Sequence, residues 1–133
     1  MPPEGLMIVE SRYGPDATAD RLAAAIDARG MAVMARIDHA AAAAKVGMEL
    51  RPTLVLMFGN PRVGTQLMQA AQTTGIDLPL KMLIWRDPAG ATWVGYNDPH
   101  WIAQRHGAAV GVVGAMAQGL EALAREATGA NDP

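Results

Sequence analysis

The chain has no cysteine among its 133 residues. This excludes disulfides, thiolate nucleophiles, iron–sulfur clusters and cysteine-based zinc sites. Serine is almost as scarce, because Ser11 is the only one and no nucleophile motif surrounds it. Serine hydrolase chemistry is excluded on that ground.

Charged and aromatic residues are also few. Eleven basic and thirteen acidic side chains give a net charge of −2 without a basic cluster, and aromatic residues make up 5% of the chain. Nucleic-acid binding rests on cationic contacts to phosphate and often on aromatic stacking, so we expect no nucleic-acid partner. The charged fraction of 18% is below the roughly 25% of an ordinary soluble domain. We interpret this deficit as surface hidden in a homodimer or a higher homo-oligomer.

Long apolar runs are missing as well. No run approaches the roughly 18 residues of a membrane-spanning helix, and the first residues, MPPEGLMIVES, lack the basic flank and apolar core of a secretion signal. We therefore expect no membrane partner, no cofactor and a cytoplasmic location. The length fits one domain over residues 1–133, with its core at 5–126 and a flexible tail at 128–133.

Hydrophobic spacing predicts five strands and two main helices. Alternating or unbroken apolar runs place strands at 6–10, 31–37, 53–58, 80–85 and 91–96. Helical spacing predicts long helices at 16–30 and from about residue 107 onward, and shorter pieces at 40–47, from Leu67 to Gly75 and at 98–105. The residues Asp87-Pro88-Ala89-Gly90 are typical of a hairpin loop, so the last two strands are expected neighbours.

This order of elements favours a two-layer α+β fold, with a mainly antiparallel sheet and helices on one face. The alternative is an α/β fold with parallel crossovers, because the connections at 40–47 and 66–75 are long enough to cross over. If helices cover one face only, the strands at Leu54–Phe58 and Leu80–Trp85 leave an apolar face bare. Such a patch usually marks an interface, and a symmetric homodimer is the simplest cover.

Several short motifs carry a family resemblance. They are IDHAAAA at 37–43, LRPT at 50–53, FGNPRVGTQLM at 58–68, DLPLK at 77–81, YNDP at 96–99 and then His106. In this order and spacing the chain resembles the bacterial family called domain of unknown function 302, from Gly5 to His106. The resemblance implies a two-layer fold similar to the TATA-box-binding-protein-like class, without DNA binding. It brings no established reaction or ligand, and it does not reach the Gly-rich segment after His106.

The clearest candidate site is the segment GNPRVGT at 59–65, between a strand and a helix. Its glycines have the spacing of a phosphate-cradling loop. It lacks the lysine that follows the second glycine in such loops, and Pro61 removes a backbone donor, so nucleoside-triphosphate hydrolysis is not expected. Free backbone N–H groups at a helix start still favour a small anionic ligand. The same residues also fit a plain turn with Asn60 or Thr65 as the helix cap.

A second polar grouping adds to this site. Asp77 precedes the fourth strand, and Tyr96, Asn97 and Asp98 end the fifth strand, where they could face Asn60. We therefore expect a polar ligand pocket here. The ligand-binding candidates are Asn60, Arg62, Gly64, Thr65, Asp77 and Tyr96.

Histidine is the usual proton-transfer residue near neutral pH. His39 and His106 are therefore candidates for the general base of a cofactor-free enzyme. Adjacent strand residues point to opposite faces, so Asp38 is not expected to orient His39, and a histidine that binds backbone is the simpler interpretation. His100 and His106 are separated by about 240° around a helix, so we expect no metal site.

Nine methionines are present. We interpret those at 7, 34, 57, 68, 82 and 116 as core filler rather than a cofactor site, since methionine adapts to irregular gaps. The composition and motifs together predict a small homo-oligomeric binding or interaction domain with a pocket for a small, anionic ligand. The alternatives are the cofactor-free enzyme and an interaction module that has no pocket.

Overall fold

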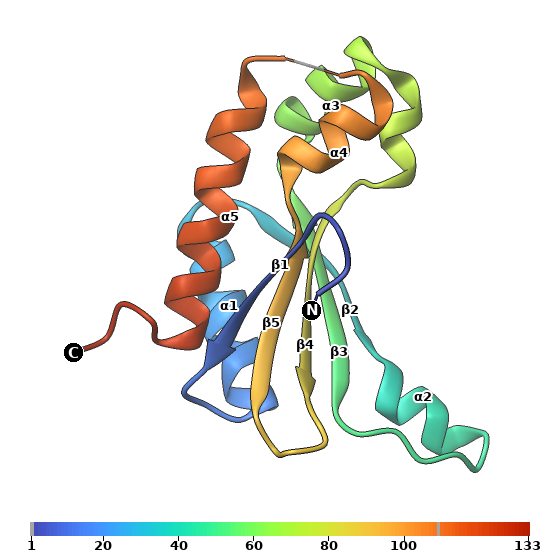
Figure 1. Ribbon diagram of the computed structural model, residues 1–133, viewed down its shortest axis with the longest axis vertical. Helices are drawn as coiled ribbons and strands as arrows, with labels where there is room; N and C mark the ends of the chain where they lie inside the picture. Colours follow the sequence, from blue (N-terminus) through green and yellow to red (C-terminus); the bar gives the residue numbers. More distant parts are fainter. Residues whose placement is uncertain (1, 109) are drawn as a thin grey trace.

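The computed structural model describes residues 2–108 and 110–133 and contains a five-stranded sheet with helices packed on it (Figure 1). The strands are β1 (Leu6–Ser11), β2 (Ala32–Asp38), β3 (Thr53–Gly59), β4 (Leu80–Arg86) and β5 (Thr92–Asn97). Their order in the sheet is β1-β5-β4-β3-β2, and each neighbouring pair is antiparallel. The predicted α+β fold is confirmed, and the alternative with parallel crossovers is wrong.

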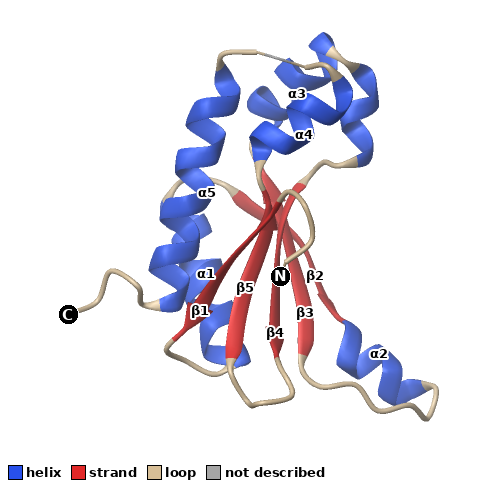
Figure 2. Ribbon diagram, viewed as in Figure 1, coloured by secondary structure: helices blue, strands red, loops and turns tan. Residues whose placement is uncertain are grey.

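The helices occupy three places around this sheet (Figure 2). Two long helices, α1 (Pro15–Ala28) and α5 (Val112–Thr128), lie side by side on one face. At one end of the sheet lie α3 (Pro61–Ala70), the 3₁₀ helix η1 (Gln72–Ile76) and α4 (Pro99–His106). At the opposite end, α2 (His39–Lys45) extends away from the strands.

The core lies between the sheet and the two long helices. Alternate residues of β3, namely Leu54, Leu56 and Phe58, are buried there. They pack in one cluster with Leu22 of α1 and Leu120 of α5. Burying each of these side chains stabilises the fold by about 1.5–3 kcal/mol.

The other face of the sheet carries no helix among the described residues. There, Val55 and Met57 of β3 are half-buried, as is Trp85, which lies opposite Trp93 on β5. Although β3 is an unbroken apolar run, helices bury only alternate residues of it. The bare apolar face expected from the layered fold is therefore present.

Three helix boundaries differ from the sequence prediction. Helix α3 begins at Pro61 and not at Leu67, because Asn60 caps it. The other two follow from local backbone conformation. Gly107 caps α4 in the left-handed region at φ +69°, which ends a helix, so α5 begins at Val112 instead of near residue 107. Ala71 is extended (φ −151°, ψ 105°), so α3 ends at Ala70. Ala71 is the N-cap of η1, which contains the remaining residues up to Gly75.

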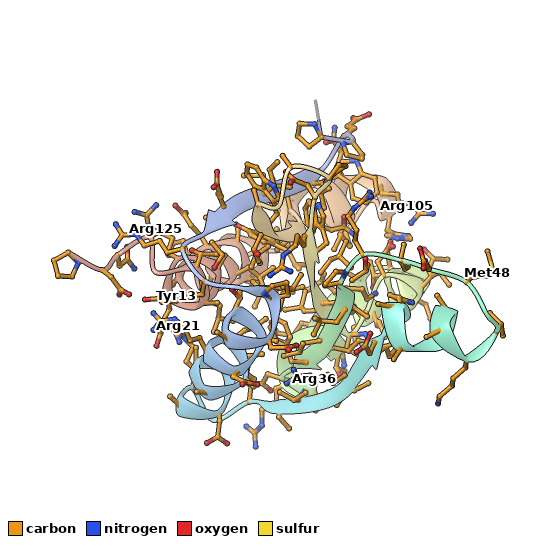
Figure 3. The ribbon with its side chains drawn as sticks, turned by 90° about the horizontal axis from the view of Figure 1, so that it is seen from below. Tyr13, Arg21, Arg36, Met48, Arg105 and Arg125 are labelled. Carbon is orange, nitrogen blue, oxygen red and sulfur yellow. The ribbon has the colours of Figure 1, made fainter. Side chains whose placement is uncertain are left out.

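The C-terminal residues make contacts on the side of α1 (Figure 3). Tyr13 Oη donates a 2.8 Å hydrogen bond to the Asp132 carboxylate, which Arg21 also reaches at 3.2 Å. Nearby, Arg125 Nε donates to Asn131 Oδ1 at 2.9 Å. The segment predicted as a flexible tail thus lies against α1 and the loop before it.

Candidate functional site

The start of α3 is a fully capped turn. Asn60 is the N-cap, and its Oδ1 accepts a 3.0 Å hydrogen bond from the Arg62 N–H. Its backbone carbonyl accepts from Val63 at 3.0 Å and from Gly64 at 3.1 Å, and Pro61 has no N–H. The turn therefore uses the donors that the sequence had left free for an anion.

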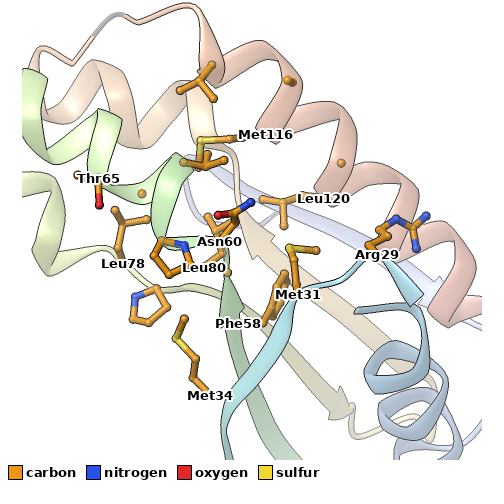
Figure 4. Close-up of a pocket in the computed structure, with 18 of the residues that line it drawn as sticks. Arg29, Met31, Met34, Phe58, Asn60, Thr65, Leu78, Leu80, Met116 and Leu120 are labelled. Atoms are coloured by element: carbon orange, nitrogen blue, oxygen red, sulfur yellow. The ribbon is translucent and has the colours of Figure 1, made fainter. Parts of the chain in front are cut away.

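A cavity of about 510 Å³ lies directly beside this turn (Figure 4). One wall comes from α3 and the residues before β4, and the facing wall comes from the first three turns of α5. Residues at the adjacent ends of β2 and β3 complete it. Its volume is within the range of small-molecule sites, which is about 300–1,000 Å³.

The wall of the cavity is almost entirely apolar. Apart from Arg29, Asn60 and Thr65, the described residues that line it are apolar or glycine. These are Met31, Met34, Phe58, Gly59, Pro61, Val63, Gly64, Met68, Gly75, Leu78, Pro79, Leu80, Val112, Ala115, Met116, Gly119, Leu120 and Leu123. Such a wall favours an apolar ligand, because burying apolar surface is the main gain available there.

Three polar side chains remain, and they differ in what they can offer. Arg29 donates to Glu126 at 2.8 Å and to the Ala25 carbonyl at 3.1 Å, so its charge is already paired. Asn60 uses its Oδ1 as the helix cap, which leaves its amide NH₂ as a donor. The Thr65 side chain is exposed at the other side of the cavity (Figure 4). The polar contacts available to a ligand are therefore uncharged.

Four methionines line the cavity, at 31, 34, 68 and 116. The interpretation of methionines as core filler holds for Met82 and Met116, which are 0% and 7% exposed. It is wrong for Met7 and Met34, which are 46% and 51% exposed. A flexible thioether adapts to ligands of different shape, so these side chains suit a binding wall as well as a core.

The predicted ligand residues divide into two groups. Asn60, Gly64 and Thr65 line the cavity, whereas the Arg62 side chain is exposed outside it. Tyr96 is part of the core at 6% exposure, and its pKa is raised chiefly by desolvation and then by the nearby Glu121 carboxylate. The polar pocket expected from the sequence is thus an apolar cavity with a few polar groups.

Asp77 also lies outside the cavity, because it binds residues of α4. Its Oδ2 is 2.5 Å from Nε2 of His106, and both carboxylate oxygens accept hydrogen bonds from Arg105 at 2.9 Å. The other ring nitrogen of His106, Nδ1, is 2.8 Å from Thr73 Oγ1. His106 therefore links α4 to η1 and to the segment before β4, outside the cavity.

His39 lies far from this region. It begins α2 and is exposed, at the end of β2 that pairs with the start of β3, whereas Asn60 follows the other end of β3. Asp38 caps α2 by accepting from the Ala41 N–H at 2.9 Å. As expected, Asp38 does not orient His39, and neither histidine candidate lines the cavity.

Clustered metal ligands and membrane-spanning helices are absent from the part of the chain that the structure describes. Within 2–108 and 110–133, no three His, Asp or Glu side chains gather closely enough to hold a metal ion. The helices within this part of the chain are all too short or too polar to span a bilayer.

Comparisons with known proteins find both sequence and structural relatives. "Fluoride-specific ion channel FluC 1" of Brucella suis biovar 1 and its namesake of Brucella abortus biovar 1 are each 48% identical over 102 residues. The match covers 77% of this chain and 40% and 38% of those relatives, so the chain spans about two fifths of their length.

A solved structure shares the fold. The crystal structure of an uncharacterised conserved DUF302 protein from Bacillus stearothermophilus matches with a TM-score of 0.82 and 18% identity, over 93% of this chain and 98% of the other. The model of the family described as "Domain of unknown function DUF302" matches residues 7–127, which includes the Gly-rich segment that the motifs did not reach. The chain therefore belongs to the DUF302 family.

Proposed function

We propose that this protein binds a small, mainly apolar molecule in the cavity between α3 and α5. The observation that carries the proposal is the wall itself, which encloses about 510 Å³ and presents only three polar side chains among the described residues. The free amide NH₂ of Asn60 would orient one polar group of the ligand. The ligand is thus an apolar body with a single neutral hydrogen-bonding group.

This proposal replaces the small anion favoured by the sequence. The backbone donors at the start of α3 are used inside the turn, and the nearby Arg29 guanidinium is paired with Glu126. An anion in the cavity would lose its hydration without gaining a free positive charge. The fluoride named for the Brucella relatives is small and charged, so it is not the ligand we propose for this cavity.

The enzyme alternative receives no support from the site. A general base must reach the proton that it abstracts. His39 and His106 both lie outside the cavity, and the ring nitrogens of His106 are engaged by Asp77 and Thr73. We therefore propose a binding protein.

The test measures the thermal stability of the protein with three probes. These are 1-decanol, decanoate and sodium sulfate. Decanol should raise the melting temperature, because a ligand that binds only the folded state stabilises it by about 2.7 kcal/mol at 100 times its Kd. Sulfate should leave the melting temperature unchanged. Decanoate should raise the melting temperature by no more than decanol does.

A matched pair of variants ties the effect to the cavity. Gly119 lines the cavity, and a Cβ added there meets no atom within 4 Å, so Gly119→Leu places a side chain into the free space. Gly114→Leu makes the same change on α5 outside this cavity, also into open space. Gly119→Leu should abolish the decanol shift, and Gly114→Leu should retain it.

Three results would contradict the proposal. One is the absence of any decanol shift in the wild type. Another is an equal decanol shift in the Gly119→Leu and Gly114→Leu variants. A sulfate shift as large as that of decanol would instead support an anion site.

A further inference from the structure

Exposed apolar side chains concentrate in one stretch of the chain. We call residues 32–50 the edge segment, which contains β2, α2 and the loop before β3. Among residues 2–108 and 110–133, nine large apolar side chains are exposed, and six of them belong to it. They are Val33, Met34, Ile37, Val46, Met48 and Leu50.

The helix of this segment packs only loosely on its own chain. It contacts β3, but none of the seven residues of α2, five of them alanine, is buried. In Figure 1 the helix extends away from the body of the molecule, and Met48 lies at the periphery in Figure 3. A helix this short is marginal in water unless tertiary contacts hold it. A second surface packed over α2 would therefore stabilise it.

The strand of this segment lies at the edge of the sheet. Only β3 pairs with β2, so the outer side of β2 presents unpaired backbone N–H and C=O groups. No residue of β2 is buried. The segment carries two basic residues, Arg36 and Lys45, and two acidic residues, Asp38 and Glu49, so two such segments do not repel each other through net charge.

The exposed area of the chain also exceeds that of a compact monomer. Its accessible surface is 7553 Å². A monomer of 14.0 kDa is expected to expose about 6,700 Å². The excess is close to the roughly 800 Å² that each partner buries in a standard protein interface.

We propose that the edge segment is the interface between two copies of this chain. A two-fold axis beside the middle of β2 makes the two β2 strands antiparallel neighbours and continues the sheet from one copy into the other. A second copy is the partner we propose because the same segment offers both an unpaired strand and an exposed helix. The two-fold axis pairs β2 with the β2 of the second copy and places α2 beside the start of that strand.

This arrangement places α2 near the ligand cavity of the other copy. In an antiparallel pair, the end of one β2 lies beside the start of the second β2. Because α2 follows directly after Asp38, it comes close to Met31 and Met34 of the second copy, which line its cavity. The dimer would thus cover the cavity mouth. Formation of the interface does not depend on a bound ligand.

The open face of the sheet is a weaker candidate for this contact. Its side chains Val55, Leu83, Trp85 and Trp93 are already half-buried. A Cβ added at Gly95 would lie 2.9 Å from the Trp85 ring, so the ring packs closely over that glycine. Less apolar area remains to be gained there than along the edge segment.

The first test is sedimentation velocity at micromolar concentration. The wild type should sediment at twice the 14.0 kDa mass of one chain. Met48→Asp should raise the dimer dissociation constant at least about tenfold. Ile76→Asp is the matched control, because Ile76 is 73% exposed and Met48 is 66% exposed, but Ile76 lies outside the edge segment. That variant should remain dimeric.

The second test uses the absence of cysteine from the chain. Single cysteines placed in turn at positions 32–37 should form a disulfide-linked dimer where the position lies next to the axis, since Cα atoms must come within about 7 Å. A cysteine at Glu10, on the opposite edge strand β1, serves as the control and should give no linked dimer.

Each of the following outcomes would overturn the proposal. The first is a wild type that stays monomeric. If that monomer still binds decanol, the dimer proposal fails and the ligand proposal stands. The second is an equal loss of the dimer in Met48→Asp and Ile76→Asp. The third is a dimer lost in Val55→Asp but retained in Met48→Asp, which would assign the contact to the open face of the sheet.

Discussion

Nε2 of His106 lies 2.5 Å from Oδ2 of Asp77. Both side chains are largely buried, at 7% and 13% exposure, and the other ring nitrogen lies 2.8 Å from Thr73 Oγ1. His106 is the last residue of α4, and Asp77 directly follows η1. The pair therefore fixes α4 to the segment that leads into β4 and forms part of the cavity wall.

The first prediction concerns removal of this carboxylate. Asp77→Ala should lower the free energy of unfolding by about 1–3 kcal/mol, because it leaves a buried histidine nitrogen without its partner. Urea denaturation at neutral pH measures this. Arg105→Ala is the control, since its side chain is 50% exposed and the loss of its pair should cost less than about 1 kcal/mol. Equal effects of the two variants would contradict a structural role for the buried pair.

The sequence predicted the strands well because their signal is local. Alternation of apolar residues and the hairpin residues at Asp87–Gly90 placed all five strands within about two residues of their observed bounds. The start of α5 was missed because Gly107 could belong to a helix or end one. Only its positive φ decides between these, and residue type alone does not give that angle.

The site was predicted only in part because it depends on distant contacts. Asn60 and Thr65 were named from a local motif, and they line the cavity. The apolar wall joins Met31, Leu78 and Met116, which are far apart in the sequence, and no local pattern relates them. Asp77 and His106 were predicted in separate roles, because residues that are 29 positions apart show no spacing that brings them together.

The second prediction concerns pH and the hairpin between β4 and β5. The pKa of Asp87 is lowered, first by the hydrogen bond from the Trp93 indole at 2.9 Å and then by that from the Ala91 N–H. Because the pKa of this carboxyl is lower in the folded state, its ionised form adds stability at pH values above its pKa in the unfolded chain. That stability is lost as pH falls through the folded pKa. The urea midpoints of wild type and Asp87→Asn should therefore differ at pH 7 and converge in acid.

Trp93→Phe provides the check on the cause. It removes the indole donor but keeps a ring on the sheet, so the pKa of Asp87 should rise toward its usual value. The acid loss of stability runs from the unfolded pKa down to the folded pKa, so it should be smaller than in the wild type and should end at a higher pH. An unchanged acid profile in both variants would show that the hairpin contact has no linkage to stability.

The third prediction compares two glycines. An added Cβ at Gly95 would lie 2.9 Å from Trp85, so Gly95→Ala should destabilise the fold by about 1–3 kcal/mol through displacement of that ring. Gly119→Ala is the control, because its Cβ meets open space inside a helix, and it should stabilise by about 0.5–1 kcal/mol. Thermal unfolding measures both, and a neutral Gly95→Ala would mean that Trp85 moves without cost.

The fourth prediction concerns the C-terminal contact. The pKa of Tyr13 is raised, chiefly because its hydroxyl donates to the Asp132 carboxylate and further because of desolvation. A raised pKa in the folded state means that the contact stabilises fully below the usual tyrosine value of about 10 and is lost as pH rises through the folded pKa. The urea midpoint of the protein should therefore fall as pH rises above about 10.

The variant Asp132→Asn isolates that contact. It removes the charge that holds the phenol neutral, so the Tyr13 step in a tyrosinate absorbance titration should move to lower pH. Tyr96 also titrates late, but its pKa is raised by burial and by Glu121 and Asp98, so its step should stay in place and serve as an internal control. If both steps stay unchanged, Asp132 does not hold the C-terminus against Tyr13 in solution.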